Sequence, residues 1–180
     1  MKKSIELIFR ILILVLGGIF FVVLQKWFIL PIFALIWFLF ELGNTKEKRM
    51  KYLKIAISMG IFLMVFDFIF ENFGAVYGYW RTINSSFFVY LVPIEIMLTC
   101  IFGGAAWYFF ISKYNNKFFI ITNLIIWSIG GMLGEMFLIS INFMNYGNGW
   151  LSMPHAFVSY LLTFILLYSI NYFLVKRIGN

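Results

Sequence analysis

The chain has 180 residues, of which 63% are hydrophobic and only 12% are charged, and its net charge is +7. Soluble domains carry about one quarter charged residues, so this composition excludes an ordinary soluble protein and indicates a single integral membrane domain. The basic residues fall in short loops, so we expect no nucleic acid partner. The lone Cys100 excludes a disulfide framework and a cluster of thiolate ligands.

The apolar segments of the chain predict six membrane-spanning helices. They cover about residues 6–25, 27–42, 55–73, 87–111, 118–143 and 155–175. Helices are required because an unpaired backbone amide in hydrocarbon is costly, whereas a helix satisfies its own amides. We therefore expect an all-α, polytopic membrane bundle in which the short second span forms a tight antiparallel hairpin with the first.

The first segment has some features of a signal peptide, because Lys2, Lys3 and Arg10 lie ahead of its apolar run. The run then passes through Gln25-Lys26-Trp27 directly into the next apolar segment, with no small-x-small cleavage pattern. We therefore predict a first helix that is retained.

The basic residues predict the orientation of the chain. Only Lys26 and Arg81 fall on one side of the six predicted spans. By the positive-inside rule, the richer side faces the cytoplasm. We therefore predict a multi-pass cell membrane protein with both termini in the cytoplasm. The basic residues on that side are Lys2, Lys3, Arg10, Lys46, Lys48, Arg49, Lys51, Lys54, Lys113, Lys117, Lys176 and Arg177.

The two outer loops, residues 74–86 and 144–154, are rich in Gly, Asn, Tyr and Trp. Such loops are typical of a lid or of the rim of a site. The polar and aromatic residues in and beside them are therefore our candidates for binding a substrate. These residues are Asn72, Tyr79, Trp80, Asn142, Trp150 and His155.

The sequences around these loops also hint at an internal repeat. Glu71 precedes a Tyr-Gly-Tyr-Trp run, and Glu135 precedes a Tyr-Gly-Asn-Gly-Trp run. Each unit then enters a helix through a proline, Pro93 or Pro154. The pattern predicts a diverged duplication of a helix pair, over residues 55–111 and 118–175.

Four carboxylates, those of Asp67, Glu71, Glu95 and Glu135, fall inside the predicted spans. At 1.5 Å per residue, they would lie about 9, 3, 10 to 12 and 12 Å inside the outer ends of their helices. An ionisable side chain inside a bilayer is costly, so its presence there is a hypothesis of function. We expect no special role for the acidic residues at the cytoplasmic ends, Glu6, Glu41 and Glu47.

No Lys or Arg accompanies the four carboxylates at that depth, so desolvation and mutual repulsion should leave at least one of them protonated near neutral pH. A protonated acid beside an ionised one is suited to acid–base chemistry without a cofactor. Two other uses remain open. Single carboxylates can hydrogen-bond between helices, and together with His155 they can hold a divalent ion, although a single His disfavours a metal site.

The segments Glu71-Asn72-Phe73-Gly74, Tyr77-Gly78-Tyr79-Trp80 and Pro93-Ile94-Glu95 resemble the lycopene cyclase domain family and the related carotenoid hydratases, over the third to fifth helices. In those families a Trp after an acidic helix end is followed by a Pro-x-Glu motif, often Pro-x-Glu-Glu. Here Ile96 stands at the position of the second Glu, and Met153-Pro154-His155 contains no such motif. The layout also resembles that of small membrane terpene cyclases.

The resemblance implies that Glu95 is the Pro-x-Glu acid, with Asp67 and Glu71 as its partners and Glu135 in the second unit. We therefore expect an isoprenoid- or carotenoid-modifying enzyme that acts on a hydrophobic substrate taken from the bilayer, by cyclisation, hydration or isomerisation. The alternative is a small ion- or proton-coupled transporter, or an accessory membrane subunit, that uses the same carboxylates. A homo-oligomer is compatible with either function.

Overall fold

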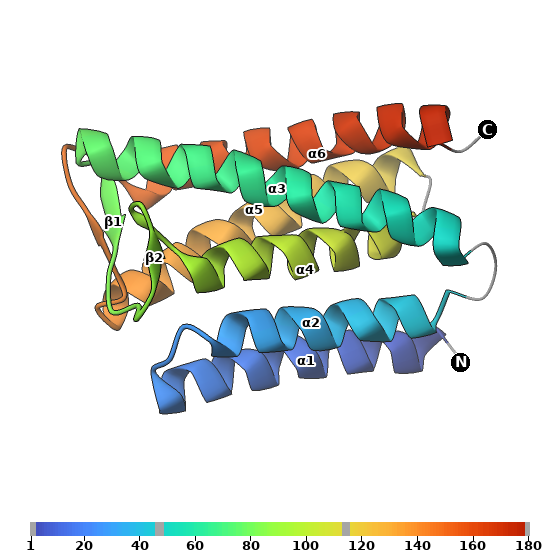
Figure 1. Cartoon of the computed structure of the whole chain (residues 1–180), viewed down its shortest axis with the longest axis horizontal. Coiled ribbons are helices and arrows are strands. Elements are labelled where there is room, and N and C mark those ends of the chain that lie inside the picture. Colours follow the sequence, from blue (N-terminus) through green and yellow to red (C-terminus); the bar gives the residue numbers. More distant parts are fainter. Residues whose placement is uncertain (1–2, 46–48, 113–115, 179–180) are drawn as a thin grey trace.

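The computed structural model describes residues 3–45, 49–112 and 116–178. In this part of the chain, six helices run side by side along the long axis of the molecule (Figure 1). They are α1 (Lys3–Leu24), α2 (Ile29–Gly43), α3 (Arg49–Tyr77), α4 (Ile94–Ile111), α5 (Lys117–Ser140) and α6 (Phe157–Ile178).

Five of the described helices are long and apolar enough to cross a membrane, which indicates a multi-pass membrane protein. The exception is α2, which is apolar but has 15 residues. At 1.5 Å per residue it is about 22 Å long, whereas the hydrocarbon core of a bilayer is about 30 Å thick. The prediction of six helices is therefore confirmed in the described part of the chain, and five of the six are long and apolar enough to span the membrane.

The closest backbone contacts follow one order through the helices. α1 and α2 make an antiparallel hairpin, which lies against α4 through α2 (Figure 1). Close contacts then join α4 to α3, α3 to α6 and α6 to α5. The order in space is therefore α1, α2, α4, α3, α6, α5, and the two outermost helices, α1 and α5, are not among the closely contacting pairs.

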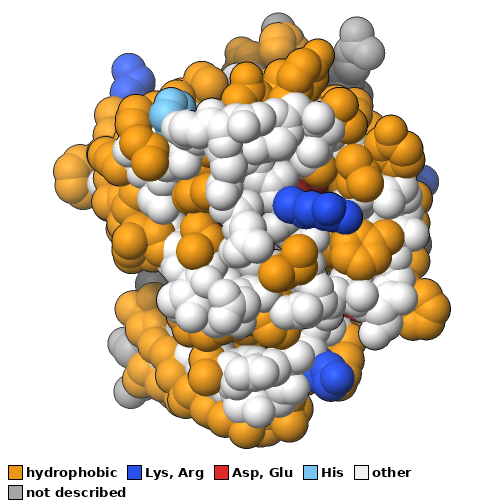
Figure 2. Space-filling view, turned by 90° about the vertical axis from the view of Figure 1, so that its left-hand side faces the viewer, with side chains coloured by type: hydrophobic (Ala, Val, Ile, Leu, Met, Phe, Trp, Pro, Cys, Tyr) orange, Lys and Arg blue, Asp and Glu red, His pale blue; other side chains and the backbone are white. Residues whose placement is uncertain are grey.

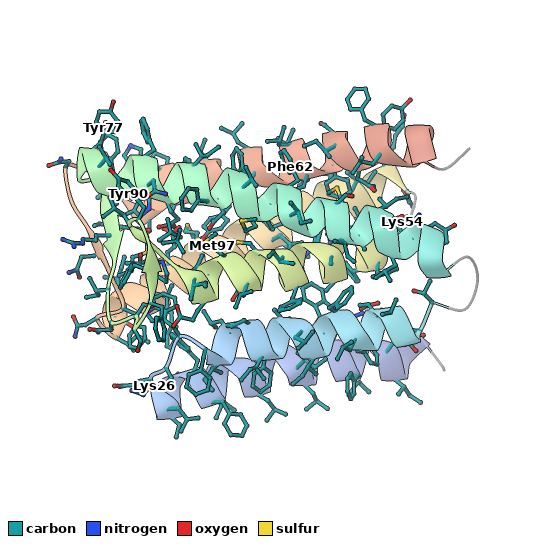
Figure 3. The ribbon with its side chains drawn as sticks, in the orientation of Figure 1. Lys26, Lys54, Phe62, Tyr77, Tyr90 and Met97 are labelled. Carbon is teal, nitrogen blue, oxygen red and sulfur yellow. The ribbon has the colours of Figure 1, made fainter. Side chains whose placement is uncertain are left out.

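The two ends of the bundle differ. Both termini lie at one end, which we call the terminus end, and short strands gather at the other, the strand end (Figure 1). β1 (Trp80–Thr82) pairs with β4 (Met144–Tyr146), and β2 (Phe88–Val89) pairs with β3 (Val92–Pro93), both antiparallel. Lys26 lies at the strand end, and Lys54 lies toward the terminus end (Figure 3). That the terminus end faces the cytoplasm stays a prediction.

The fourth helix begins later than the sequence predicts. Residues 87–93, which we expected to be helical, form the β2–β3 hairpin instead. Tyr90 turns this hairpin with a positive φ of 59°, and Pro93 precedes α4 in an extended conformation. Periodicity cannot separate a strand from a buried helix in so short an apolar run. As a result, Glu95 lies in the first turn of α4 and not two turns inside it.

The ends of α3 and α5 also change the depths of the other three carboxylates. α3 continues to Tyr77, so Asp67 and Glu71 lie about 15 and 9 Å from its strand end. α5 ends at Ser140, which places Glu135 about 7 to 8 Å from that end. The three carboxylates remain well inside the bundle, whereas Glu95 does not. α6 is preceded by one wide turn, Ser152–Ala156.

An ion pair at the terminus end corrects the expectation that Glu41 is an ordinary residue at a helix end. Glu41 is 0% exposed. It accepts hydrogen bonds from Arg10 Nε at 2.5 Å, from Arg10 Nη2 at 3.1 Å and from Trp37 Nε1 at 3.2 Å. Arg10 also donates to Glu6 at 3.3 Å. This pair links α1 to α2. Of the other residues that the sequence predicts at this end, Glu47, Lys2, Lys46, Lys48 and Lys113 lie outside the described residues.

Candidate functional site

A stripe of side chains on α3 begins the candidate site. Leu63, Asp67 and Glu71 are spaced by four residues and therefore share one face of the helix. The Cys100 thiol of α4 lies within hydrogen-bonding reach of the Asp67 carboxyl group. The other oxygen of that group, Oδ2, is buried and has no hydrogen-bond partner. Glu71 accepts a hydrogen bond of 3.1 Å from Trp80 Nε1.

Glu135 joins these residues from α5. Its carboxylate interacts electrostatically with both Asp67 and Glu71. It accepts a hydrogen bond from the Tyr146 hydroxyl group on β4, and the Tyr160 hydroxyl group on α6 lies within hydrogen-bonding reach. We call Asp67, Glu71 and Glu135 the acidic cluster. The structure thus brings together three of the four carboxylates that the sequence predicts as catalytic.

Two glycines let aromatic residues reach the acidic cluster. A methyl group at Gly74 would lie 2.0 Å from Trp80 Cε2, and one at Gly131 would lie 2.5 Å from Tyr160 Cδ1. Both distances are far shorter than a van der Waals contact. Only glycine therefore leaves room for these two rings against α3 and α5, where the Trp80 nitrogen and the Tyr160 hydroxyl group reach Glu71 and Glu135.

No cation neutralises the acidic cluster within the part of the chain that the structure describes. The ion pairs there, Arg10–Glu6 and Arg10–Glu41, both lie at the terminus end. The neutral donors that face the cluster come from Trp80, Tyr146 and Tyr160. Tyr146 lies outside the membrane-spanning helices, and its burial, together with its hydrogen bond to Glu135, raises its pKa above the ordinary value of 10.0. Tyr146 therefore remains a hydrogen-bond donor.

Aromatic rings cover the strand-end side of the acidic cluster. Trp80, which is 3% exposed, lies 4.4 Å from Trp150 and 4.9 Å from Phe70 between ring centroids. Tyr79 and His155 lie against Trp150 at 5.8 and 5.2 Å. We call these five residues the aromatic layer. Seen from the strand end, the centre of the surface consists of backbone and uncharged polar groups crossed by a basic side chain, with hydrophobic side chains around it (Figure 2).

An apolar cavity of about 320 Å³ lies in the bundle on the other side of the acidic cluster. The cavity and the acidic cluster are lined by residues that lie one or two turns apart on the same helices. Leu63 lines the cavity one turn from Asp67, Trp127 lines it two turns from Glu135, and Phe164 lines it one turn from Tyr160. All six helices contribute to the wall, which consists of Ile13, Leu14, Gly17, Leu30, Phe33, Ala34, Trp37, Leu63, Thr99, Cys100, Gly103, Gly104, Trp107, Trp127, Phe164 and Leu167.

Glu95 lies apart from the acidic cluster. Its Oε2 accepts a hydrogen bond of 2.8 Å from Ser85 Oγ, and its carbonyl oxygen accepts one of 2.7 Å from the Thr99 hydroxyl group. It is not among the charged groups that act on Asp67 or Glu71. The physical reason is the late start of α4, which places Glu95 beneath the strand-end loops. Its contact with Ser85 fixes the segment that leads into the β2–β3 hairpin.

The predicted substrate-binding residues separate into two groups. Tyr79, Trp80, Trp150 and His155 form most of the aromatic layer. The two asparagines instead form hydrogen bonds with the strand-end loops. Asn72 Oδ1 accepts a hydrogen bond of 3.2 Å from the Leu91 amide, and the Asn142 carbonyl oxygen accepts one of 2.8 Å from Asn84 Nδ2. Asn142 lies beyond the end of α5 with a φ of 59°, although the sequence predicted a helix that continues to residue 143.

Three residues of the site were missed by sequence reasoning. Tyr146 begins the Tyr-Gly-Asn-Gly-Trp run of the predicted repeat, but that repeat matches it with Tyr77 and gave it no role at Glu135. Tyr160 and Cys100 gave no signal, because one is a tyrosine in an aromatic-rich helix and the other a single cysteine in an apolar run. Their roles follow only from the position of α6 beside α5 and of α4 beside α3.

Within the described ranges, no group of three or more His, Cys, Asp or Glu side chains is arranged to hold a metal ion. His155 instead stacks on Trp150, and its Nδ1 accepts a hydrogen bond of 3.1 Å from the Leu151 amide. Comparison with protein-family models, curated proteins and solved structures finds no match to this chain. The resemblance to the carotenoid-biosynthesis proteins therefore stays a prediction.

Proposed function

We propose that this protein is a membrane-embedded enzyme that performs acid–base chemistry on an isoprenoid or other polyene, by cyclisation, isomerisation or hydration. One observation carries the proposal. The acidic cluster has no cationic partner among the described residues and adjoins an apolar cavity within the bundle. Carboxylic acids that border a hydrocarbon-lined space are suited to a substrate whose reactive group is a carbon–carbon double bond.

The cluster supplies both an acid and a base. Three carboxylates that share one desolvated site repel one another, which favours a state in which at least one retains a proton. Asp67 is the member nearest the cavity, since Leu63 and Cys100, which line the cavity, flank it on α3 and α4. We assign the proton donor to Asp67, with Glu71 as the group that returns a proton to it.

The reaction proceeds through a carbocation. Transfer of a proton from the acid to a double bond leaves a positive charge on carbon, which an internal double bond attacks in a cyclisation. An ionised carboxylate of the cluster, Glu71 or Glu135, then removes a proton from the adjacent carbon and the product keeps the mass of the substrate. If the carboxylate activates water instead, the product is heavier by one water. No electrons are exchanged, so no redox cofactor takes part.

The aromatic layer supports this chemistry in two ways. The faces of Trp80, Trp150 and Phe70 attract a nearby cation through their π electrons. The same rings separate the acidic cluster from the strand-end surface, which limits the access of water to the cation.

The lining of the cavity favours an enzyme over a carrier. A carrier for ions or protons needs polar groups that continue toward the opposite side of the membrane. Below Asp67, the wall consists mainly of apolar residues, including Leu63, Phe164 and Leu167. A site that is polar at one end and apolar beyond it is suited to a lipophilic substrate.

The proposal is tested by expression in a lycopene-producing host, with chromatography and mass spectrometry of the extracted pigments and isoprenoid lipids. We expect a new product with the wild-type protein, and none with Asp67→Asn or Glu71→Gln. Glu95→Gln is the matched control, because Glu95 lies outside the acidic cluster. An unchanged profile with correctly inserted wild-type protein, in this host and in hosts that accumulate other polyenes, would contradict the proposal and favour ion-coupled transport.

A further inference from the structure

A second apolar cavity, of about 270 Å³, continues from the first toward the terminus end. The two cavities share three lining residues, Leu14, Trp37 and Trp127. Trp37 and Trp127 are stacked, with ring centroids 5.6 Å apart and an interplanar angle of 17°. Because both rings line both cavities, the stack lies at their boundary. The remaining wall of the second cavity is Leu7, Arg10, Ile11, Phe110, Phe119, Thr122, Asn123 and Ile126.

The two cavities lie where the backbones of α1 and α5 are not in close contact. α1 and α5 both line the second cavity but are not in close contact with each other. Side chains of these two helices are exposed, with Leu14 on α1 at 55% and Ile126 on α5 at 61%. The second cavity, which both residues line, therefore opens sideways, toward the lipid, between α1 and α5. We call the two cavities together the chain groove.

The dimensions of the chain groove define what it can hold. On α4 it extends from Thr99 to Phe110, which is about 16 Å along the helix. A helix, with a diameter of about 10 to 12 Å, would need far more width than cavities of 320 and 270 Å³ provide. A single extended hydrocarbon chain is narrow enough, and the lining is apolar along most of this length.

We propose that the first cavity of the chain groove binds the linear hydrocarbon chain of the substrate, and that the Trp37–Trp127 stack, which separates it from the second cavity, sets the length of the chain that fits. This inference rests on the proposed function, because it assigns the reactive end of the chain to the level of Cys100, next to Asp67. The tail points to the tryptophan pair, and the chain enters from the bilayer between α1 and α5.

Glycine positions provide variants that fill the groove without disturbing the backbone. Gly103 lines the first cavity, and a methyl group at this position would meet no atom within 4 Å, so Gly103→Leu places its side chain in open space. Gly130 on α5 is equally open but does not line either cavity. Gly130→Leu is therefore the matched control. Trp127→Ala removes the boundary between the two cavities, and Trp127→Phe retains a smaller ring there.

The experiment measures binding without turnover. The purified full chain in lipid nanodiscs is exposed to a series of all-trans prenols, from geraniol through farnesol and geranylgeraniol to longer homologues, each with a photoactivatable diazirine at the tail. Adducts are quantified and located by mass spectrometry. We expect wild type to bind up to a limiting length, with tail adducts near the tryptophan pair.

The variants give the decisive results. Gly103→Leu should lower binding by about tenfold or more, corresponding to about 1.4 kcal/mol, while Gly130→Leu leaves it unchanged. Trp127→Ala should move the limiting length to longer prenols by one isoprene unit or more, with a smaller shift for Trp127→Phe. Equal binding by Gly103→Leu and Gly130→Leu, or an unchanged limiting length in both Trp127 variants, would overturn the proposal.

The experiments distinguish a failure of the chain groove from a failure of the proposed function. Binding as expected, together with no product in any host, would retain the chain groove and remove the acid–base chemistry. Product formation that Gly103→Leu and the Trp127 variants do not affect would retain the enzyme and remove the chain groove. Circular dichroism and a monodisperse elution profile show for each variant that the bundle has folded.

Discussion

Trp80 and Tyr146 are paired residues on β1 and β4, and each donates a hydrogen bond to the carboxylate of the helix that precedes it, Trp80 to Glu71 and Tyr146 to Glu135. One short antiparallel ladder therefore holds two members of the acidic cluster from two different helices. The predicted repeat instead matches Trp80 with Trp150, so this pairing does not bear on the duplication. The duplication itself stays a prediction.

The hydrogen bond between Tyr146 and Glu135 should be measurable as a coupling energy. Tyr146→Phe and Glu135→Gln should each destabilise the protein, and the double variant should lose less than the sum, with a coupling of about 1 kcal/mol. Thermal unfolding in detergent measures all four proteins. Tyr90→Phe is the control, because Tyr90 is 72% exposed. Strictly additive losses would show that the bond contributes nothing to stability.

Tyr146 also predicts how stability depends on alkaline pH. Its pKa is raised by burial and by the hydrogen bond to Glu135. At pH values above the ordinary value of 10.0, the unfolded chain has lost the phenolic proton while the folded chain retains it. The stability from this group is therefore complete below pH 10 and falls as the pH rises toward the folded-state pKa. We expect the melting temperature of Tyr146→Phe to fall less than that of wild type over this range, whereas Tyr90→Phe should follow wild type.

The two neighbouring glycines of α5 provide a sharp steric test. Gly131→Ala places a methyl group 2.5 Å from the Tyr160 ring, whereas Gly130→Ala meets nothing within 4 Å. We expect Gly131→Ala to cost about 1 to 3 kcal/mol of stability and to abolish product formation by displacing Tyr160 from Glu135. Gly130→Ala should be neutral or slightly stabilising. Comparable behaviour of the two variants in unfolding and product assays would contradict the position of Tyr160.

Removing one member of the buried Arg10–Glu41 ion pair should lower the stability of the protein more than replacing both. Glu41→Gln leaves the Arg10 charge without its main partner and should cost about 3 to 5 kcal/mol. The double replacement Arg10→Met, Glu41→Leu should recover most of this loss, because no buried charge remains. Unfolding measurements on the single and double variants test this, and a double variant less stable than Glu41→Gln would contradict it.

Accessibility to a membrane-impermeant maleimide tests the orientation. In a Cys100→Ala background, we place single cysteines at Tyr90, in the strand-end hairpin, and at Ser112, at the other end of α4. The distribution of basic residues predicts that intact cells are labelled at position 90 and that position 112 requires permeabilisation. The reverse pattern would place the acidic cluster in the inner half of the bilayer.

The sequence contains strong information on the helices and weak information on how they end. Long apolar segments predicted the membrane helices because hydrocarbon permits little else. The run from Phe87 to Pro93 misled us, since its apolar residues are equally suited to a strand, and the turn depends on the positive φ of Tyr90. That single difference removed Glu95 from the acidic cluster.

The sequence also did not predict contacts between residues that are far apart along the chain. Arg10 and Glu41 are 31 residues apart, and each looked ordinary at its own helix end. Cys100 and Asp67 meet only because α4 lies against α3. In contrast, Asp67 and Glu71 on one face of α3 required only the helical period, and that part of the site was predictable.

The short length of α2 has a consequence for biogenesis. A segment of 15 residues is shorter than the roughly 17 to 25 residues of a spanning helix, so α2 alone is poorly suited to cross the bilayer. The buried contact between Arg10 and Glu41 neutralises the charge that each helix of the α1–α2 hairpin would otherwise carry alone into lipid. The α1–α2 hairpin, rather than α2 alone, is therefore the smallest unit in which both charges are compensated, and it is the unit suited to insertion into the bilayer.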